Sequence, residues 1–514
     1  MSFVKFVVDF AMTLSRREFL RLAGLVAAGA AASACAPVYQ RLANDVSQSD
    51  LPQPSDAPNT YFGALNRLTF GPRPSDRARA AEISLNGWIE EQLAPELIDD
   101  APAMWQLRRF KTLDMDANEL FEEGNKLFDD LDKSLVINEL RQATLIRQVY
   151  SPRQLYEVMV EFWSDHFNIS VDKGNCWYLK TVDDREVIRP HALGKFRDLL
   201  WASAHSPAML VYLDNQVNIN THPNENYARE IMELHSLGVN GGYTQRDVME
   251  LARCFTGWTV KEHYWLGNFT FNADSHDNGV KEVLGLRINP SGQAEAEQMI
   301  ELLAAHPSTA RFVATKLARR FIADEPPEEI VGRVASTFLE TDGDIKAVLR
   351  VILLDGLTAY AQPKFKRPVH FIASALRLLN AQTGAGGRIS SPTYPLHDYL
   401  ARLGQLAFAW PMPDGYPDRA APWQGNLMPR WQFAMALARN EIDGTQITFS
   451  ELAAATSPSA VVDRLSTLLL DQPLPATQRE ALIAALQAAG TPTSDELPSI
   501  IAAGLIASPA FQWR

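Results

Sequence analysis

The chain has 514 residues, of which 46% are hydrophobic and 21% are charged. This much apolar material can bury a sizeable core, which excludes a globally disordered protein. The formal net charge of -13 argues against nucleic acid as the main partner, because binding a phosphate backbone requires clustered lysines and arginines. Three cysteines are too few for a disulfide framework in a chain of this length, so we interpret Cys176 and Cys254 as buried thiols.

The first 35 residues have the features of an export signal. Arg16 and Arg17 stand next to each other just before a short run rich in Ala and Gly, which is the pattern of a twin-arginine signal. That run, residues 22–34, is too short and too weakly hydrophobic to cross a bilayer as a helix. The residues before Met12 are apolar and unlike the start of such a signal, which leaves Met1 and Met12 as alternative starts.

Small residues at the end of this signal are followed by Cys35, which fits two processing routes. Either the chain is cleaved after the small residues, or Cys35 becomes diacylated as in a lipoprotein. We favour the lipid, because Cys35 has no evident structural use. Residues 36–58 are polar and predict a flexible tether. The expected protein is therefore periplasmic or lipid-anchored in the cell envelope, and it contacts the membrane only through the signal or the lipid.

The rest of the chain, residues 59–514, contains no Gly/Ser-rich or single-sign charged linker and is expected to form one helical domain. Apolar periodicity and capping residues predict most of its elements. In chain order, the predicted helices cover residues 74–91, 120–150, 152–167, 224–237, 244–256, 308–323, 327–339 and 345–354. Strand signals are few, and segments 258–260 and 268–271 predict a small β-hairpin. The predicted fold class is mainly α, a multi-helical globular body.

The first candidate site residues lie near the end of the helix predicted over residues 152–167. His166 falls on the apolar stripe of this helix and should point into the core, with Asp165 at the margin of that face. A buried imidazole is either hydrogen-bonded and inert, which is the commoner case, or held for a ligand or for proton transfer. Trp163 stands beside it as a candidate cofactor contact.

The second candidate group lies on the helix predicted over residues 224–237. Helical spacing places Asn226, Glu230 and Glu233 on one face, where two carboxylates can bind a cation or carry out acid–base chemistry. The alternative is an ordinary solvated face. His235 lies nearly opposite, so it cannot share one ion with both glutamates while the helix stays regular.

The third candidate group is the pair His276 and Asp277, in a polar loop that follows several aromatic residues. A neighbouring histidine and aspartate have the chemistry of metal ligands or of a proton shuttle, although an ordinary polar turn has the same composition. The sequence contains no defined zinc motif, phosphate-binding loop, dinucleotide fingerprint or nucleophile elbow.

At these motifs the chain resembles a bacterial family catalogued as a domain of unknown function, DUF1800, over nearly all of residues 59–514. The segments that carry the resemblance are residues 65–72, 162–168, 188–194, 206–210, 224–242, 364–368, 413–417 and 507–512. The resemblance implies an exported, largely helical bacterial protein. It places several candidate residues inside the motifs of the family but assigns them no role.

Our first hypothesis is a metal- or cofactor-dependent cell-envelope enzyme of unknown reaction. Proteins with twin-arginine signals cross the membrane folded, which suits a centre that is loaded in the cytoplasm. A divalent metal is the expected cofactor, and haem is the alternative. The catalytic candidates are Asp165, His166, Asn226, Glu230 and Glu233. The metal-ligand candidates are His166, Glu230, Glu233, His276 and Asp277, and those for a larger cofactor are Trp163 and His235.

Two further hypotheses belong to other classes of protein. One is a non-catalytic envelope protein that binds a protein partner or helps to assemble it, with the aromatic segment around residues 258–271 as a contact surface. The other is a metal-free serine hydrolase in which Ser206, Ser236 or Ser275 beside a histidine acts as the nucleophile. None of these serines lies in a recognisable elbow.

Overall fold

The ranges that the computed structural model describes are residues 61–125, 133–261, 267–386, 394–449, 457–488 and 496–514. The predicted export signal with Arg16 and Arg17, the lipidation candidate Cys35 and the tether over residues 36–58 lie outside these ranges. No helix in the described ranges has both the length and the apolar character needed to cross a bilayer.

The amino-terminal half of the described chain is almost entirely helical. Its helices are α3 (Phe62–Leu68), α4 (Pro74–Gln92), α5 (Ala101–Leu107), α6 (Ala117–Gly124), α7 (Ser134–Tyr150), α8 (Gln154–His166), α9 (Cys176–Asp183), α10 (Arg189–His191), α11 (Phe196–Ala204), α12 (Pro207–Tyr212), α13 (Glu225–Glu230) and α14 (Gln245–Cys254). Two π-helical turns extend helices in this half. They are η5 (Asp184–Ile188) and η7 (Ile231–His235).

The carboxyl-terminal half is helical as well. Its helices are α15 (Ala294–Ala305), α16 (Pro307–Phe321), α17 (Glu328–Glu340), α18 (Ile345–Arg350), α19 (Leu357–Tyr360), α20 (Pro368–Leu378), α21 (Pro395–Arg402), α22 (Leu427–Ala438), α24 (Pro458–Leu470), α25 (Ala476–Ala488) and α26 (Leu497–Ala507). A third π-helical turn, η9 (Val351–Gly356), joins α18 to α19. The predicted mainly helical fold class is therefore confirmed.

The strands of the described ranges form three short antiparallel pairs. They are β1 (Trp258–Val260) with β2 (Phe269–Phe271), β3 (Lys281–Val283) with β4 (Leu286–Ile288), and β5 (Gln382–Thr383) with β6 (Thr445–Gln446). In the first pair, Trp258 stands opposite Phe271. The predicted hairpin is confirmed, and the sequence did not predict the other two pairs.

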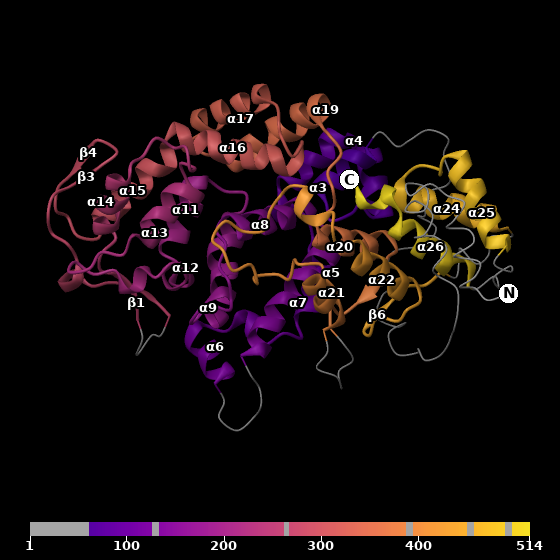
Figure 1. Ribbon diagram of the computed structural model, residues 1–514, viewed down its shortest axis with the longest axis horizontal. Coiled ribbons are helices and arrows are strands. Elements are labelled where there is room, and N and C mark those ends of the chain that lie inside the picture. Colours follow the sequence, from indigo (N-terminus) through magenta and orange to yellow (C-terminus); the bar gives the residue numbers. More distant parts are fainter. Residues whose placement is uncertain (1–60, 126–132, 262–266, 387–393, 450–456, 489–495) are drawn as a thin grey trace.

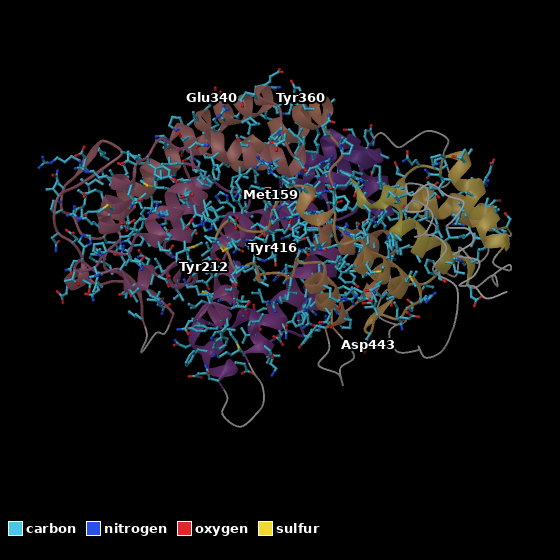
Figure 2. All side chains as sticks on the ribbon, in the orientation of Figure 1. Met159, Tyr212, Glu340, Tyr360, Tyr416 and Asp443 are labelled. Carbon is cyan, nitrogen blue, oxygen red and sulfur yellow. The ribbon has the colours of Figure 1, made fainter. Side chains whose placement is uncertain are left out.

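Helix α8 lies near the centre of the molecule (Figure 1). In this view α16 and α17 lie above α8, and α6, α7 and α9 lie below it. The segment from α11 to α15 forms one end of the molecule, and α22, α24, α25 and α26 form the other. Figure 2 shows Met159 of α8 close to the centre, whereas Glu340 and Tyr360 lie on the upper rim. A side chain on α8 can therefore contact residues from distant parts of the sequence.

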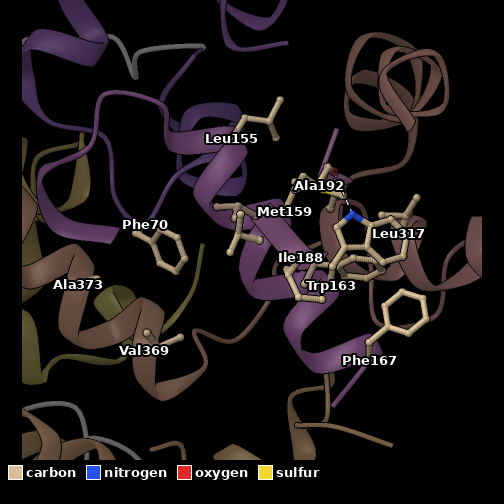
Figure 3. Packing of buried hydrophobic residues seen from close by; sticks show 14 of the residues in the cluster. Phe70, Leu155, Met159, Trp163, Phe167, Ile188, Ala192, Leu317, Val369 and Ala373 are labelled. Carbon is tan, nitrogen blue, oxygen red and sulfur yellow. Dashed lines mark hydrogen bonds between the residues drawn. The ribbon is translucent and has the colours of Figure 1, made fainter. Parts of the chain in front are cut away.

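One face of α8 is fixed by the hydrophobic core. Leu155, Met159 and Trp163 recur at four-residue spacing and are fully buried, so they form one stripe along the helix. Figure 3 shows this stripe packed against residues that include Ile188, Ala192 and Leu317. The Trp163 Nε1–H donates to the Ala192 carbonyl at 3.0 Å. Burial of these side chains sets the rotation of α8 and thereby directs its opposite face.

Several predicted helices differ from the observed ones at their ends. The helix predicted over residues 224–237 begins as expected at Asn224, whose side chain caps α13 by accepting from the Asn226 N–H at 2.9 Å. After Glu230 the backbone continues as the π-helical turn η7. The stretch over residues 120–150, which predicts one or two helices, corresponds to the end of α6 and the whole of α7, and α6 begins earlier, at Ala117.

Candidate functional site

The polar face of α8 carries three carboxylates at helical spacing. Glu157, Glu161 and Asp165 are each four residues apart, so they line one side of the helix. Glu157 is buried, and the other two are partly buried. Buried carboxylates require positively charged or hydrogen-bonding partners, so the surroundings of this face decide what it can do.

A pocket opens along this face between α7, α8, α20 and α21. It encloses about 690 Å³ of empty space, part of it open to solvent. Its apolar wall consists of Leu145, Val160, Val369, Leu400, Ala407 and Phe408. The polar groups of the lining are Arg141, Thr144, Gln148, Glu157, Glu161, Ser164, Asp165, Asn168, Asp184, His397, Gln405 and Tyr416. A largely apolar cleft with a few convergent polar groups is the usual form of a small-molecule site.

The carboxylates at one end of the pocket are held by Arg189. Its guanidinium donates to Glu157 at 3.0 Å and to Asp184 at 2.8 Å. Burial raises the pKa of Asp184, but the positive charges of Arg189 and Arg147 outweigh this effect, so the pKa lies below its usual value. Glu157, Asp184 and Arg189 therefore form a closed ion-pair cluster at this end of the pocket.

The other carboxylates, Glu161 and Asp165, share two arginines from later in the chain. Arg367 donates to both, at 2.7 Å in the case of Asp165. Arg320 lies 3.0 Å from Glu161 and 3.8 Å from Asp165. Both arginine side chains are almost fully buried, at 1% and 2% exposure. The four groups therefore form a compact network with charges of both signs beneath the pocket.

The pKa of Asp165 is shifted toward neutral pH. Burial raises its pKa to about 6, although Arg367 lowers it, and the neighbouring Glu161 adds to the rise. Its side chain is 17% exposed and lines the pocket. A carboxyl group that titrates near neutral pH in a cleft has the properties of a general acid or base. The structure therefore places the predicted candidate Asp165 in a setting that suits proton transfer.

The ion network continues from α8 to the loop over residues 410–418. Arg320 contacts Asp418 at 3.0 Å, and Lys364 contacts Asp418 at 3.5 Å. At the end of α8, the Asn168 side chain donates to the carbonyls of Trp410 and Met412. The loop is thus bound at both of its ends, and it carries Tyr416 into the lining of the pocket.

Close packing of this loop on α8 requires a glycine at position 415. Gly415 has a φ of +73°, and a Cβ atom at this position would overlap the backbone carbonyl of Asp165. Gly415→Ala is therefore expected to push the loop away from α8 and to destabilise the protein by more than the roughly 1 kcal/mol that an unfavourable left-handed conformation alone costs. Chemical denaturation measures this loss.

The matched control for this prediction is Gly242→Ala. Gly242 also has a positive φ, +86°, but a Cβ there would meet no atom within 4 Å. The difference in stability loss between the two variants therefore measures the effect of the steric clash alone. Equal losses of stability in Gly415→Ala and Gly242→Ala would show that the contact between the loop and Asp165 does not matter.

His166 and His235 lie close together in the core. Their ring centroids are 6.2 Å apart, and both side chains are 1% exposed. The His166 Nε2–H donates to the His235 backbone carbonyl at 3.1 Å. Burial, followed by the charge of Lys316, holds the pKa of His166 well below its usual value and lowers that of His235 to about 3. Both imidazoles are therefore neutral at physiological pH.

Glu230 and Glu233 lie at the end of α13 and in η7, on a partly exposed surface. Burial and the charge of Glu233 raise the pKa of Glu230. Asn226 is turned to other partners, because its side chain donates to the Leu213 carbonyl at 3.2 Å. Lys316 and His235 are the charged or titratable groups that shift the pKa of His166, and neither glutamate is among them. Of the predicted residues, Glu230 and Glu233 therefore lie on a partly exposed acidic face, whereas His166 and His235 lie in an aromatic part of the core.

His276 and Asp277 each have a structural partner. The His276 ring contacts Glu295 at 3.1 Å and the Thr256 carbonyl at 2.8 Å, and Asp277 accepts from Arg253 at 2.7 Å. The Arg253 hydrogen bonds lower the pKa of Asp277 to about 2 despite partial burial. The pair therefore fixes the loop before β3, and the polar-turn alternative describes it better than the metal alternative.

The residues present do not fit the predicted metal centre. Within the described ranges, no group of three or more His, Cys, Asp or Glu side chains is arranged to hold a metal ion. Of the candidates for a larger cofactor, Trp163 donates its indole N–H to the Ala192 carbonyl, and His235 packs 5.1 Å from the Phe167 ring. His276 and Asp277 already have hydrogen-bond and ion-pair partners, whereas Glu230 and Glu233 lie on a partly exposed surface.

The serines predicted as nucleophiles also have other partners. The Ser206 hydroxyl donates to Asp183 at 2.7 Å, and the Ser236 hydroxyl donates to the Ile231 carbonyl at 2.5 Å. Ser275 accepts from the Asn272 side chain at 3.0 Å. None of the three is hydrogen-bonded to a histidine ring within the described part of the chain.

Most residues that line the pocket were not predicted from the sequence. Glu157 and Glu161 could have been found, because their spacing to Asp165 follows the helical period opposite the apolar stripe. Arg141, Arg320 and Arg367 carry no such signal, since their partners are brought to them only by folding.

Comparison with known proteins gives a family but no described relative. A search of curated proteins and a search of solved structures each find no match. A family model described as "Protein of unknown function (DUF1800)" matches residues 63–513, which include α8, the pocket lining and the ion network. With a match over this much of its length, the chain belongs to the DUF1800 family.

Proposed function

We propose that the protein is an exported cell-envelope enzyme that hydrolyses a small molecule bound in the pocket along α8, with Asp165 as the general acid. The observation that carries this proposal is the setting of Asp165. It is a carboxyl group with a pKa of about 6 that lines a cleft. Groups shifted toward neutral pH in a cleft are the usual proton donors and acceptors of enzymes.

The ion network supplies the conditions for this chemistry. Arg367 holds the Asp165 carboxylate in place through a hydrogen bond of 2.7 Å, so proton transfer requires no reorientation of the side chain. Water from solvent attacks the scissile bond and forms the new bond to oxygen, and it releases its proton to bulk water. Protonated Asp165 donates its own proton to the leaving-group oxygen as the old bond breaks, and the resulting carboxylate is stabilised by Arg367. Ser164, the neighbouring residue, also lines the pocket and can hydrogen-bond the substrate.

The proposed reaction uses no metal ligand from the chain. The carboxylates of the pocket are already paired with arginines, and a carboxylate that binds a metal must be free to turn toward it. Acid catalysis by a positioned carboxyl group contributes roughly 10²–10⁴-fold to a rate. This contribution is sufficient to make a single residue decisive for turnover.

The pH dependence of turnover tests this proposal. The purified protein is assayed between pH 4.5 and pH 8.5 with alkyl esters, alkyl glycosides and alkyl phosphates, whose poor leaving groups need a proton from a general acid. Because the acid form of Asp165 is the active one, kcat/KM for the accepted class should fall as the pH rises through about 6. A rate that does not change across this range, or no turnover of any class, would overturn the assignment.

Export is the second part of the proposal and rests on the amino-terminal sequence alone. Adjacent Arg16 and Arg17 before a weakly hydrophobic run direct a folded protein to the twin-arginine route, and Cys35 is the acceptor for a lipid. Cell fractionation should find the protein in the envelope, and the double variant Arg16→Lys/Arg17→Lys should retain it in the cytoplasm. Continued export of that variant would contradict this part without affecting the chemistry of the pocket.

A further inference from the structure

The pocket contains one charged side chain that is not neutralised by an ion pair. Each of its carboxylates has an arginine partner at hydrogen-bonding distance: Arg189 serves Glu157 and Asp184, and Arg367 serves Glu161 and Asp165. Arg141 forms no ion pair with a carboxylate of the described ranges, although its guanidinium lines the same pocket. The charge of the Arg141 guanidinium is thus available to a ligand.

Arg141 is held in position, and its terminal nitrogens make no hydrogen bond within the described ranges. Its Nε–H donates to the Ala407 carbonyl at 3.0 Å, which fixes the plane of the guanidinium. Burial lowers the pKa of Arg141, and the exposed Asp172 only partly offsets this effect. A guanidinium does not lose its proton in a protein, so the incomplete neutralisation favours a bound anion.

The groups beside Arg141 do not compete with an incoming anion. His397 is buried next to it, and burial followed by the charge of Arg141 lowers the pKa of His397 to about 3. This imidazole is therefore neutral. The lining that Arg141 and Asp165 share also includes Leu145 and Val160, which favour contact with an apolar body over a second charged group.

We propose that the pocket takes a small organic anion whose planar carboxylate pairs with Arg141 and whose apolar body lies along the wall toward Asp165. Arginine suits this role because its planar fork binds a carboxylate through two parallel hydrogen bonds. The inference rests on the proposed function in one respect, since it names the substrate class of the same pocket. The substrate is then an organic acid that carries the hydrolysed bond at its other end.

Binding of benzoate to the full chain tests the inference without any turnover. Isothermal titration should give saturable binding of benzoate, and benzamide, which has the same shape but no charge, should bind at least tenfold more weakly. Phenyl phosphate separates two sources of negative charge. If it binds more tightly than benzoate, the pocket is a phosphate site and the assignment of a carboxylate is overturned.

Variants of Arg141 show whether the anion is where we place it. Arg141→Gln should weaken benzoate binding by at least tenfold, and Arg141→Lys should weaken it by less, because lysine keeps the charge but lacks the planar fork. The matched control is Arg402→Gln, a change at an exposed arginine bonded to Gln432, which should leave binding unchanged. Undiminished binding in Arg141→Gln, or no binding to the unaltered protein, would overturn the inference.

The two proposals fail in distinguishable ways. If the protein binds benzoate through Arg141 but hydrolyses none of the alkyl esters, glycosides or phosphates, the anion site stands and the hydrolytic function is wrong. If it hydrolyses one of these classes with the expected pH dependence while Arg141→Gln binds benzoate normally, the function stands and the substrate class is wrong.

Discussion

Replacing Asp165 by asparagine is expected to lower the turnover of any substrate hydrolysed in the pocket by about 10²–10⁴-fold, the usual contribution of a general acid. Asparagine has nearly the same size and can still accept the hydrogen bond from Arg367, but it cannot donate a proton to a leaving group. The effect should appear in kcat, because proton transfer assists the chemical step more than substrate binding. The fall in kcat/KM near pH 6 should also disappear.

The control for this prediction is Asp274→Asn, because Asp274 is an exposed carboxylate in the turn before His276. That variant should keep the rate and the pH profile of the unaltered protein. Chemical denaturation of Asp165→Asn shows whether the change has also unfolded the pocket. A folded Asp165→Asn variant that retains most of its turnover would contradict the role of Asp165.

Arg367→Met is expected to reduce the free energy of unfolding by about 3–5 kcal/mol, as is typical when one partner of a buried ion pair is removed. Arg367 is 2% exposed, and its partners Glu161 and Asp165 are 10% and 17% exposed. After the substitution, two adjacent carboxylates would share the single guanidinium of Arg320. Methionine fills a similar volume, so the loss reports mainly on charge and not on a cavity. Urea denaturation at pH 7 measures it.

A surface ion pair supplies the comparison for Arg367→Met. Arg350 and Glu90 are 2.8 Å apart, but their side chains are 45% and 46% exposed. Water screens such a pair and solvates either partner alone, so Arg350→Met should cost no more than about 1 kcal/mol. If both substitutions cost the same, the network beneath the pocket is not the buried structure described above.

A raised pKa of Asp165 has a further consequence for stability. Its folded-state pKa of about 6 exceeds the usual 3.8, so the folded protein holds this proton more tightly than the unfolded chain. The corresponding stabilisation is complete below about pH 3.8 and is lost as the pH rises through about 6. The surroundings of Asp165 thus disfavour its charged form near neutral pH. A group held in an unfavourable state is more typical of a catalytic site than of a structural ion pair.

Local sequence patterns predicted the elements of this fold well where one periodicity continues without interruption. The apolar stripe of α8 predicted its existence and the inward direction of His166, because residues four apart always lie on one helical face. The same rule failed beyond Glu230, where the backbone changes to the π-helical turn η7. Such a turn shifts every later side chain on the helix, and no local signal in the sequence marks it.

The sequence by itself determined the helical fold class, the small aromatic hairpin and the position of Asp165 on α8. These features depend on interactions between residues close in the chain, where spacing alone fixes geometry. Only the tertiary structure decided that Arg320 and Arg367 neutralise the acids of α8, or that Arg141 is left with its charge free. Arg367 stands 202 residues from Asp165 in the chain. Because a charge acts through distance in space and through burial, its partner and its pKa exist only once folding has brought the two together.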